Sequence, residues 1–146
     1  MAGEEIKGMM RDFLKAVMEK DVDGALSLCT EDAVWVNPMG TFEGKSEIKR
    51  GVTWMNQTTP DMKVTETGIG IIAQGDTGVY EHILSGTIEG KAWEVLAMCV
   101  YEFSGAKIKN IRTVYDRLLL AQQVSKGVLA KSAVNAIVNN MEKGLK

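Results

Sequence analysis

The sequence is poor in the residues that build metal sites and covalent scaffolds. Its 146 residues include one histidine, His82, two cysteines, Cys29 and Cys99, and two prolines. A single imidazole excludes an intrachain site with two or more histidine ligands, and two thiols exclude a thiolate-rich metal cage. Both cysteines lie in apolar segments. We expect reduced, buried thiols, as is usual in the cytosol, with a disulfide between them as the alternative.

Long apolar runs and an excess of positive charge are absent as well. No stretch reaches the roughly 18 consecutive apolar residues of a membrane-spanning helix, and the acidic start Met-Ala-Gly-Glu-Glu does not resemble a signal peptide. With 17 Lys+Arg against 19 Asp+Glu the net charge is −2, which argues against nucleic-acid binding. Neither a phosphate-binding glycine loop nor a hydrolase nucleophile elbow occurs. We therefore expect a cytoplasmic protein without a cofactor.

The first 60 residues have the patterns of helices. The sequence is 45% hydrophobic and 25% charged, as in ordinary globular domains. Residues 4–19 repeat apolar side chains at helical spacing, and a short second helix is expected over 22–29. A strand over 33–36 and a turn at Asn37-Pro38-Met39-Gly40 precede a third helix that ends before Pro60.

The second half of the chain has the pattern of an antiparallel sheet. Four β-rich runs, 62–73, 77–89, 92–103 and 107–119, are separated by short breaks that contain glycine. Helices followed by strands indicate an α+β domain in which the helices pack on one face of a curved sheet.

The run over 92–103 is apolar on both of its faces. Trp93, Val95, Ala97, Cys99 and Tyr101 alternate with Leu96, Met98 and Val100. A sheet with one face in water should alternate apolar and polar residues. We therefore expect a homodimer through the outer face of the sheet, with cover by the chain's own C-terminal segment as the alternative.

The C-terminal segment, residues 121–146, is amphipathic and basic. It carries four lysines and one glutamate, and its apolar stripe is interrupted near Gly127, where we expect a break. Such a helix can lie on an anionic membrane surface, but we favour docking on its own domain or on a partner protomer. We divide the chain into a domain of residues 1–120 and a helical extension of residues 121–146.

The order of these elements resembles the nuclear transport factor 2-like superfamily, and within it the SnoaL-like branch of polyketide cyclases and ketosteroid-isomerase-like proteins. The resemblance spans roughly residues 4–118 and rests on residues Leu26–Trp35, the Asn37-Pro38-x-Gly40 turn, Phe42-Glu43-Gly44-Lys45 and the closing segment from Lys107 to Asp116. It implies a cone-shaped curved antiparallel sheet (a cystatin-like roll), three N-terminal helices, an extra C-terminal helix, and no single reaction, because this fold serves many functions.

The acidic residues of the family's known reactions are missing. The resemblance places Asn37 where ketosteroid isomerases have their proton-abstracting carboxylate, and Phe13 and Cys99 where they have the tyrosine and aspartic acid of the oxyanion hole. The aspartate of the SnoaL-like cyclases falls near Thr113, and their pocket histidine near Cys99. An amide is not a general base near neutral pH, so these mechanisms are disfavoured.

The resemblance also indicates which side chains face the interior of the cone. His82 is our candidate acid or base, since its ordinary pKa is close to neutrality, although a structural histidine is the plainer reading. Asp116 is a weaker candidate, because strict alternation points it outward unless a bulge intervenes. The expected pocket residues are Phe13, Trp35, Asn37, Val52, Met55, Tyr80, Trp93, Val95, Cys99, Tyr101, Thr113 and Tyr115.

This pocket predicts that the protein binds a hydrophobic small molecule. The leading hypothesis adds cofactor-free isomerisation, cyclisation or hydration, with His82 as acid or base and with Asn37, Tyr80 and Tyr115 orienting the substrate. The alternative is a non-catalytic ligand-binding or dimeric assembly module.

Overall fold

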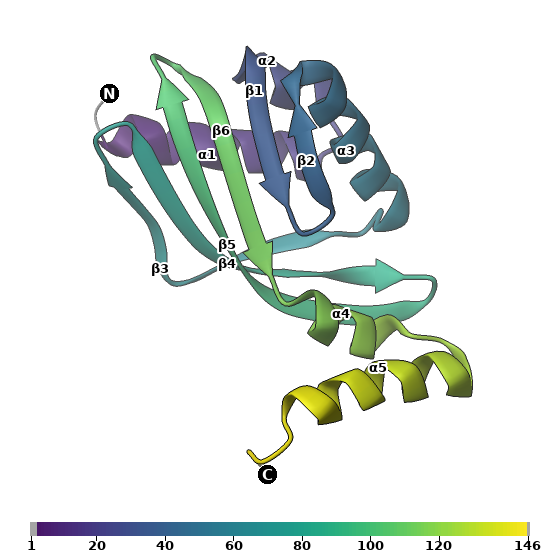
Figure 1. The fold of residues 1–146 in the computed structure, drawn as a ribbon. Coiled ribbons are helices and arrows are strands. Elements are labelled where there is room, and N and C mark those ends of the chain that lie inside the picture. The colour runs from purple at the N-terminus through teal and green to yellow at the C-terminus, as the bar shows by residue number, and fades with distance from the viewer. Residues whose placement is uncertain (1–2, 146) are drawn as a thin grey trace.

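A computed structural model describes residues 3–145. The chain forms the expected α+β domain, in which one curved sheet carries helices on its inner face (Figure 1). In chain order the elements are α1 (Gly3–Met18), α2 (Val22–Ser27), β1 (Cys29–Asn37), β2 (Gly40–Glu43), α3 (Gly44–Thr58), β3 (Lys63–Gln74), β4 (Thr77–Ile88), β5 (Lys91–Ser104), β6 (Lys107–Tyr115), α4 (Arg117–Val124) and α5 (Gly127–Met141).

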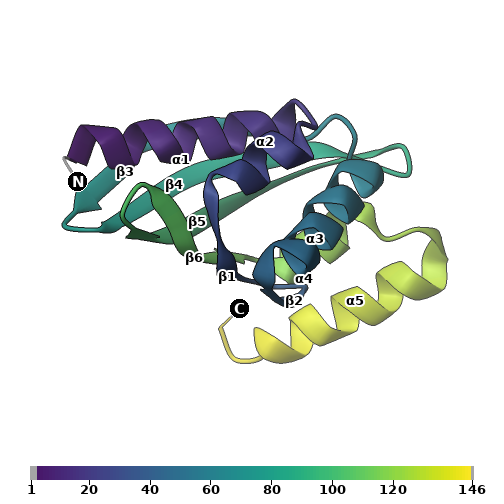
Figure 2. The ribbon, with the colours of Figure 1, turned by 90° about the horizontal axis from the view of Figure 1, so that it is seen from above.

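The first two helices form where the sequence patterns predict them. In α1 the buried residues Ile6, Met10, Phe13 and Val17 are spaced by three or four positions, so they share one helical face. Helix α2 begins at an N-cap, where the Asp21 side chain accepts a hydrogen bond from the Gly24 amide at 2.9 Å. Figure 2 shows α1 lying along β3 and β4, while α3 covers the β1 end of the sheet.

The six strands lie in the order β2-β1-β6-β5-β4-β3. All neighbours are antiparallel except β1 and β6, which pair in parallel. The expectation of a wholly antiparallel sheet is thus wrong for this one pair, and β2 was not foreseen. The sequence signals local hairpins, whereas β6 pairs with β1 across α3 and the four strands β2 to β5 that lie between them in the chain.

The inner face of β5 supplies much of the core. Every second residue from Trp93 to Phe103 is buried, and Leu96 and Met98 between them are exposed on the outer face. Glycine at position 78 is required where α1 crosses β4, because a Cβ there would meet the side chains of Met10 and Ile6. This close packing of α1 on β4 fixes one wall of the interior.

The C-terminal segment differs from its prediction in two respects and agrees with it in one. The run expected to remain a strand to residue 119 ends at Tyr115, because Asp116 caps α4 and turns the chain into a helix. The extension is therefore two helices, with the expected break at Gly127, whose φ is +78°. Helix α5 packs chiefly on α4 and buries none of its residues, so the stripe with Ile137 and Met141 does not dock on the domain.

Two negative findings hold for residues 3–145. No helix among them is long and apolar enough to cross a membrane. Cys29 and Cys99 are both buried and unpaired, as expected.

Candidate functional site

A cavity of about 170 Å³ lies between the inner face of the sheet and the helices α1, α3 and α4. Its described lining contains no aspartate, glutamate, lysine or arginine. Four methionines, Met18, Met39, Met55 and Met62, contribute flexible side chains to the wall. Trp54 and Met39 are the large lining residues most exposed to solvent, at 45% and 43%, so they mark its opening.

Most of the residues expected in the pocket line this cavity, and two do not. The lining includes Phe13, Trp35, Asn37, Val52, Met55, His82, Trp93, Cys99, Tyr101, Thr113 and Tyr115. Val95 is buried on the same face of β5 but lies outside the cavity wall. Tyr80 faces a second, more open pocket beside Arg11 and Glu66, beneath α1. Its ring stacks on the His82 imidazole at 4.6 Å, so it supports that residue from outside the cavity.

Asp116 does not reach the cavity. Its carboxylate accepts a hydrogen bond from the Leu119 amide at 2.8 Å and so forms the N-cap of α4. The bulge that would have turned it inward is absent from this part of β6. The sequence Asp-Arg-Leu-Leu contains an N-cap signal for a helix. The alternation of side chains along the strand does not take this signal into account.

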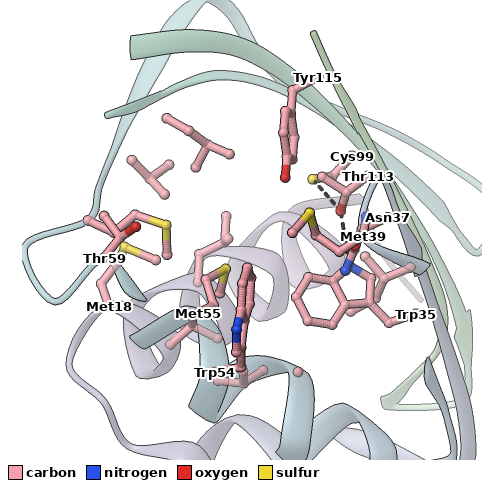
Figure 3. A pocket seen from close by; sticks show the side chains of 18 of the residues that line it. Met18, Trp35, Asn37, Met39, Trp54, Met55, Thr59, Cys99, Thr113 and Tyr115 are labelled. Carbon is pink, nitrogen blue, oxygen red and sulfur yellow. Dashed lines mark hydrogen bonds between the residues drawn. The ribbon is translucent and has the colours of Figure 1, made fainter. Parts of the chain in front are cut away.

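Trp35, Thr113 and Cys99 form a chain of polar contacts at one end of the cavity (Figure 3). Trp35 Nε1 donates to Thr113 Oγ1 at 3.1 Å, and Thr113 Oγ1 lies 3.3 Å from Cys99 Sγ. Burial raises the pKa of the Cys99 thiol to about 11, so the thiol is protonated near neutrality and is a poor nucleophile. The polar side chains at this end of the cavity are therefore partnered with one another.

Asn37 is held by its own turn. Its Oδ1 accepts a hydrogen bond from the Met39 amide at 2.7 Å, an arrangement typical of an Asx turn. The amide therefore shapes the β1–β2 turn at the cavity opening, in addition to lining the cavity.

His82 is buried, with 1% of its surface exposed, and it lies midway along the inner face of β4. Its Nδ1 is 3.3 Å from the Tyr80 carbonyl oxygen. Because a carbonyl only accepts, Nδ1 carries the proton, and in the neutral ring the lone pair is on Nε2. Burial lowers the pKa of the imidazole, partly offset by this hydrogen bond. Near neutral pH His82 is thus an uncharged hydrogen-bond and proton acceptor.

Two further aromatic residues, Tyr115 and Trp93, line the cavity. The Tyr115 hydroxyl points into the space opposite Trp54 (Figure 3), and burial raises its pKa, so it remains protonated. Trp93 is 7% exposed, and its Nε1 has no hydrogen-bond partner among the described residues.

Helix α4 forms a wall of the cavity that the sequence analysis did not foresee. Leu120 lines the cavity, and Gln123 pairs with the backbone of Glu94 through two hydrogen bonds of 2.7 and 2.9 Å. Arg117 donates to the Pro38 carbonyl at 2.9 Å, which fastens the start of the helix to the β1–β2 turn. The apolar run at 118–120 is the available signal for this wall, but the β-rich pattern extends over 107–119 and masks it.

The described residues contain no group of three or more histidine, cysteine, aspartate or glutamate side chains close enough to hold a metal ion. The polar groups of the cavity lining are those of Asn37, His82 and Cys99, of two tyrosines, Tyr101 and Tyr115, and of three tryptophans and three threonines. Such a set can hold oxygen atoms of a ligand by hydrogen bonds and can accept a proton at one point.

Comparison with known proteins gives a family and a fold. The model of the SnoaL-like domain family matches residues 10–111, whereas a search of curated proteins finds no match. An NTF2-like protein from Burkholderia xenovorans LB400 superposes with a TM-score of 0.71 at 20% identity, over 86% of this chain and 99% of that one. A putative polyketide cyclase from Xanthomonas campestris pv. campestris gives 0.76 at 15% identity, over 84% and 98%.

A third similar structure is that of TerC co-crystallised with polyporic acid. It superposes with a TM-score of 0.74 at 18% identity, over 84% of this chain and 99% of that one. At these identities the likeness concerns the fold alone.

Proposed function

The chain belongs to the SnoaL-like domain family, and from this premise we propose that it binds a neutral, hydrophobic small molecule in the cavity between sheet and helices. The observation that carries the proposal is the lining itself, which is aromatic and aliphatic and has no charged side chain among the described residues. A charged ligand would lose its hydration there without a compensating charge. A neutral apolar ligand loses only unfavourable contact with water.

The size of the cavity favours a compact ligand. At about 170 Å³ it is close to the engineered cavity of about 150 Å³ that holds benzene. A molecule of two or more fused rings therefore requires that the wall yields. The methionine side chains and the half-exposed Trp54 are the groups that can move at low cost.

Binding is tested with tetralin, a neutral bicyclic hydrocarbon, by the rise in thermal melting temperature and by ligand-detected NMR. Met55→Trp fills the cavity and should abolish both signals. Met98→Trp is the matched control, because Met98 is exposed on the outer face of the sheet. If tetralin fails to bind the wild type, or binds both variants equally, the proposal is wrong.

As the leading reaction we propose cofactor-free proton transfer with His82 as the base. Its neutral imidazole lines the cavity with the lone pair on Nε2. The register places Tyr115 and His82 on either side of Ala97, so a donor and an acceptor face the same stretch of cavity. His82 would take a proton from the carbon next to a carbonyl, and the electron pair of the broken C–H bond would pass to the carbonyl oxygen.

This reaction is tested by deuterium uptake into 2-tetralone in D₂O. The wild type should exchange the carbon-bound protons faster than His82→Gln, which retains a polar side chain but is not a base. If 2-tetralone binds but exchanges no faster than in buffer, His82 is not catalytic. The protein would then be a non-catalytic binding module, which is the second candidate function.

We also propose that two protomers pair through the outer face of the sheet. Leu96, Met98 and Val114 are exposed there, and Met98 lies opposite Val114 in the register of β5 and β6. Contiguous exposed apolar residues of this kind mark association surfaces. Sedimentation should give a dimer for the wild type and a monomer for Met98→Glu, and a wild-type monomer would refute the proposal.

A further inference from the structure

The second pocket, beneath α1, shares a wall with the cavity. It has a volume of about 200 Å³ and lies between α1 and β3, the strand at one edge of the sheet (Figure 2). Leu14 and Met18 of α1 and Val64 of β3 line both spaces. All three are half-buried, and Met18 lies across the cavity from Trp35 (Figure 3). A single layer of residues therefore stands between the cavity and the second pocket.

The residues of this layer can move at low cost. Methionine is unbranched and adapts its shape to its surroundings, and Met18 is the last residue of α1. The Leu14 side chain can change between staggered rotamers. When these two side chains turn aside, the cavity of about 170 Å³ and the second pocket become one elongated site. The additional space is what a ligand larger than benzene requires.

The two spaces differ in charge. The described lining of the cavity has no charged side chain, whereas Arg11, Lys15 and Glu66 line the second pocket. Arg11 and Lys15 are one turn apart on α1 and are loosely paired, Arg11 with Glu66 at 3.4 Å and Lys15 with Glu19 at 4.0 Å. Six ion pairs elsewhere in the described chain are 2.6–2.9 Å long. Because exposed pairs contribute little stability, both cations are free to turn toward an anion.

We infer that the shared wall opens on binding, and that the protein takes elongated ligands with a neutral ring system in the cavity and an acidic end beside Arg11 and Lys15. This inference rests on the proposed binding function and adds the chemical class of the ligand. The acidic end remains in the second pocket, where the half-exposed side chains of Arg11 and Glu66 show that water has access. It therefore avoids the loss of hydration that a charge in the cavity would suffer.

The register of the sheet makes this placement compatible with proton transfer at His82. Tyr115, Ala97, His82 and Glu66 are direct partners on β6, β5, β4 and β3, so they form one row across the sheet. Neighbouring strands are about 4.8 Å apart. A ligand that lies along this row contacts Tyr115 and His82 with its ring system, and its acidic end reaches the second pocket one strand further on.

The test uses tetralin that carries a butanoic acid chain on its aromatic ring, and compares it with plain tetralin and with the matching butylamine. The wild type should bind the acid more tightly than the amine. Lys15→Ala should weaken binding of the acid by about 2- to 5-fold, as expected for one exposed ion pair, and leave tetralin binding unchanged. Lys49→Ala is the matched control, because this exposed lysine also pairs with a carboxylate but lines neither pocket.

Nuclear Overhauser effects in the wild-type complex locate the chain of the acid. The protons of the chain should show contacts to the methyl group of Met18, whose signal among the nine methionines is assigned with Met18→Leu. A chain that leaves through the opening of the cavity would instead show contacts to the Trp54 indole.

Failure of the inference and failure of the proposed function are distinguishable. If tetralin itself does not bind, the proposed function fails and the inference with it. If tetralin binds but the wild type does not prefer the acid to the amine, or the chain contacts Trp54, the inference is wrong and the binding function stands. Equal weakening of acid binding by Lys15→Ala and Lys49→Ala would reveal an effect of net charge alone, which also overturns the inference. The two wild-type measurements decide the matter even if a variant folds poorly.

Discussion

The two ends of the cavity differ in how fully the protein satisfies its own polar groups. At the β1–β6 end, the indole of Trp35, the hydroxyl of Thr113 and the thiol of Cys99 contact one another, and the Trp35 ring packs on Phe42 at 5.6 Å. At the β4–β5 hairpin, the indole of Trp93 has no such partner among the described residues. One end is organised for stability, whereas the other retains a donor at a cost in stability. The two ends therefore differ in what their polar groups contribute to stability.

The largest effect is expected from Gly86→Ala at the hairpin end. A Cβ at this position would meet the Thr59 side chain and lie 3.3 Å from the Met62 backbone. Overpacking of this kind costs about 1–3 kcal/mol in free energy of unfolding, because the end of α3 must move away from β4. Urea denaturation measures the loss. Gly68→Ala is the control, since a Cβ there meets nothing within 4 Å, and equal losses in both variants would contradict the packing argument.

The sequence predicts most of the elements that local patterns determine. The 3.6-residue repeat of α1, the Asp21 cap and the glycine turns between β3, β4, β5 and β6 all act over a few residues. The parallel pairing of β1 with β6 joins segments about eighty residues apart along the chain, and no local signal encodes it. Asp116 shows where side-chain alternation along a strand fails as a predictor. The alternation predicts that the last strand continues past this residue, whereas helix α4 begins there.

The candidate site likewise combines features that local patterns predict with features that depend on tertiary packing. Membership of the inner face follows from strand alternation, which is why most of the expected pocket residues line the cavity. The pairing of Trp35 and the isolation of Trp93 depend on which side chains arrive from β6 and α3, so two similar residues acquire different roles. The wall supplied by Leu120 depends on the packing of α4 on β5, a tertiary contact that the apolar pattern of residues 118–120 does not specify.

His82, in the middle of the cavity, should make the free energy of unfolding depend on pH. Burial lowers the pKa of this imidazole in the folded state, whereas the unfolded chain titrates near 6.5. Above pH 6.5 both states are neutral. Below it the unfolded state binds a proton first, so the free energy of unfolding falls on acidification, by at most about 1.4 kcal/mol per pH unit.

Urea denaturation at pH 7.5 and pH 5.5 measures this dependence. His82→Gln should remove it in that window, since His82 is the only histidine. An unchanged slope in the variant would show that other groups cause it.

A smaller effect should separate the two tryptophans directly. Both Trp→Phe variants lose one fused ring, but Trp35→Phe also leaves Thr113 without its donor. Trp35→Phe should therefore reduce the free energy of unfolding by about 1 kcal/mol more than Trp93→Phe. Because both variants replace tryptophan by phenylalanine, most of the loss of apolar contact cancels when their free energies of unfolding are compared. If Trp93→Phe proves the more damaging, its indole N–H has a partner in the folded protein, and the contrast between the two ends fails.

The smallest effect concerns the wall that joins the two ends. Strand β6 covers the edge of β5 only from Ala97 onward, and the Gln123 amide takes over at Glu94 by pairing with both backbone groups. Gln123→Ala should cost about 0.5–1 kcal/mol and, more distinctively, should speed amide hydrogen exchange in α4 and at Glu94. The neighbouring Gln122→Ala, on an exposed position, should do neither. Because Leu120 lies on the same helix, loosening α4 should also speed release of any ligand that binds in the cavity. Faster exchange without faster release would mean that α4 covers the edge of β5 but does not control access to the cavity.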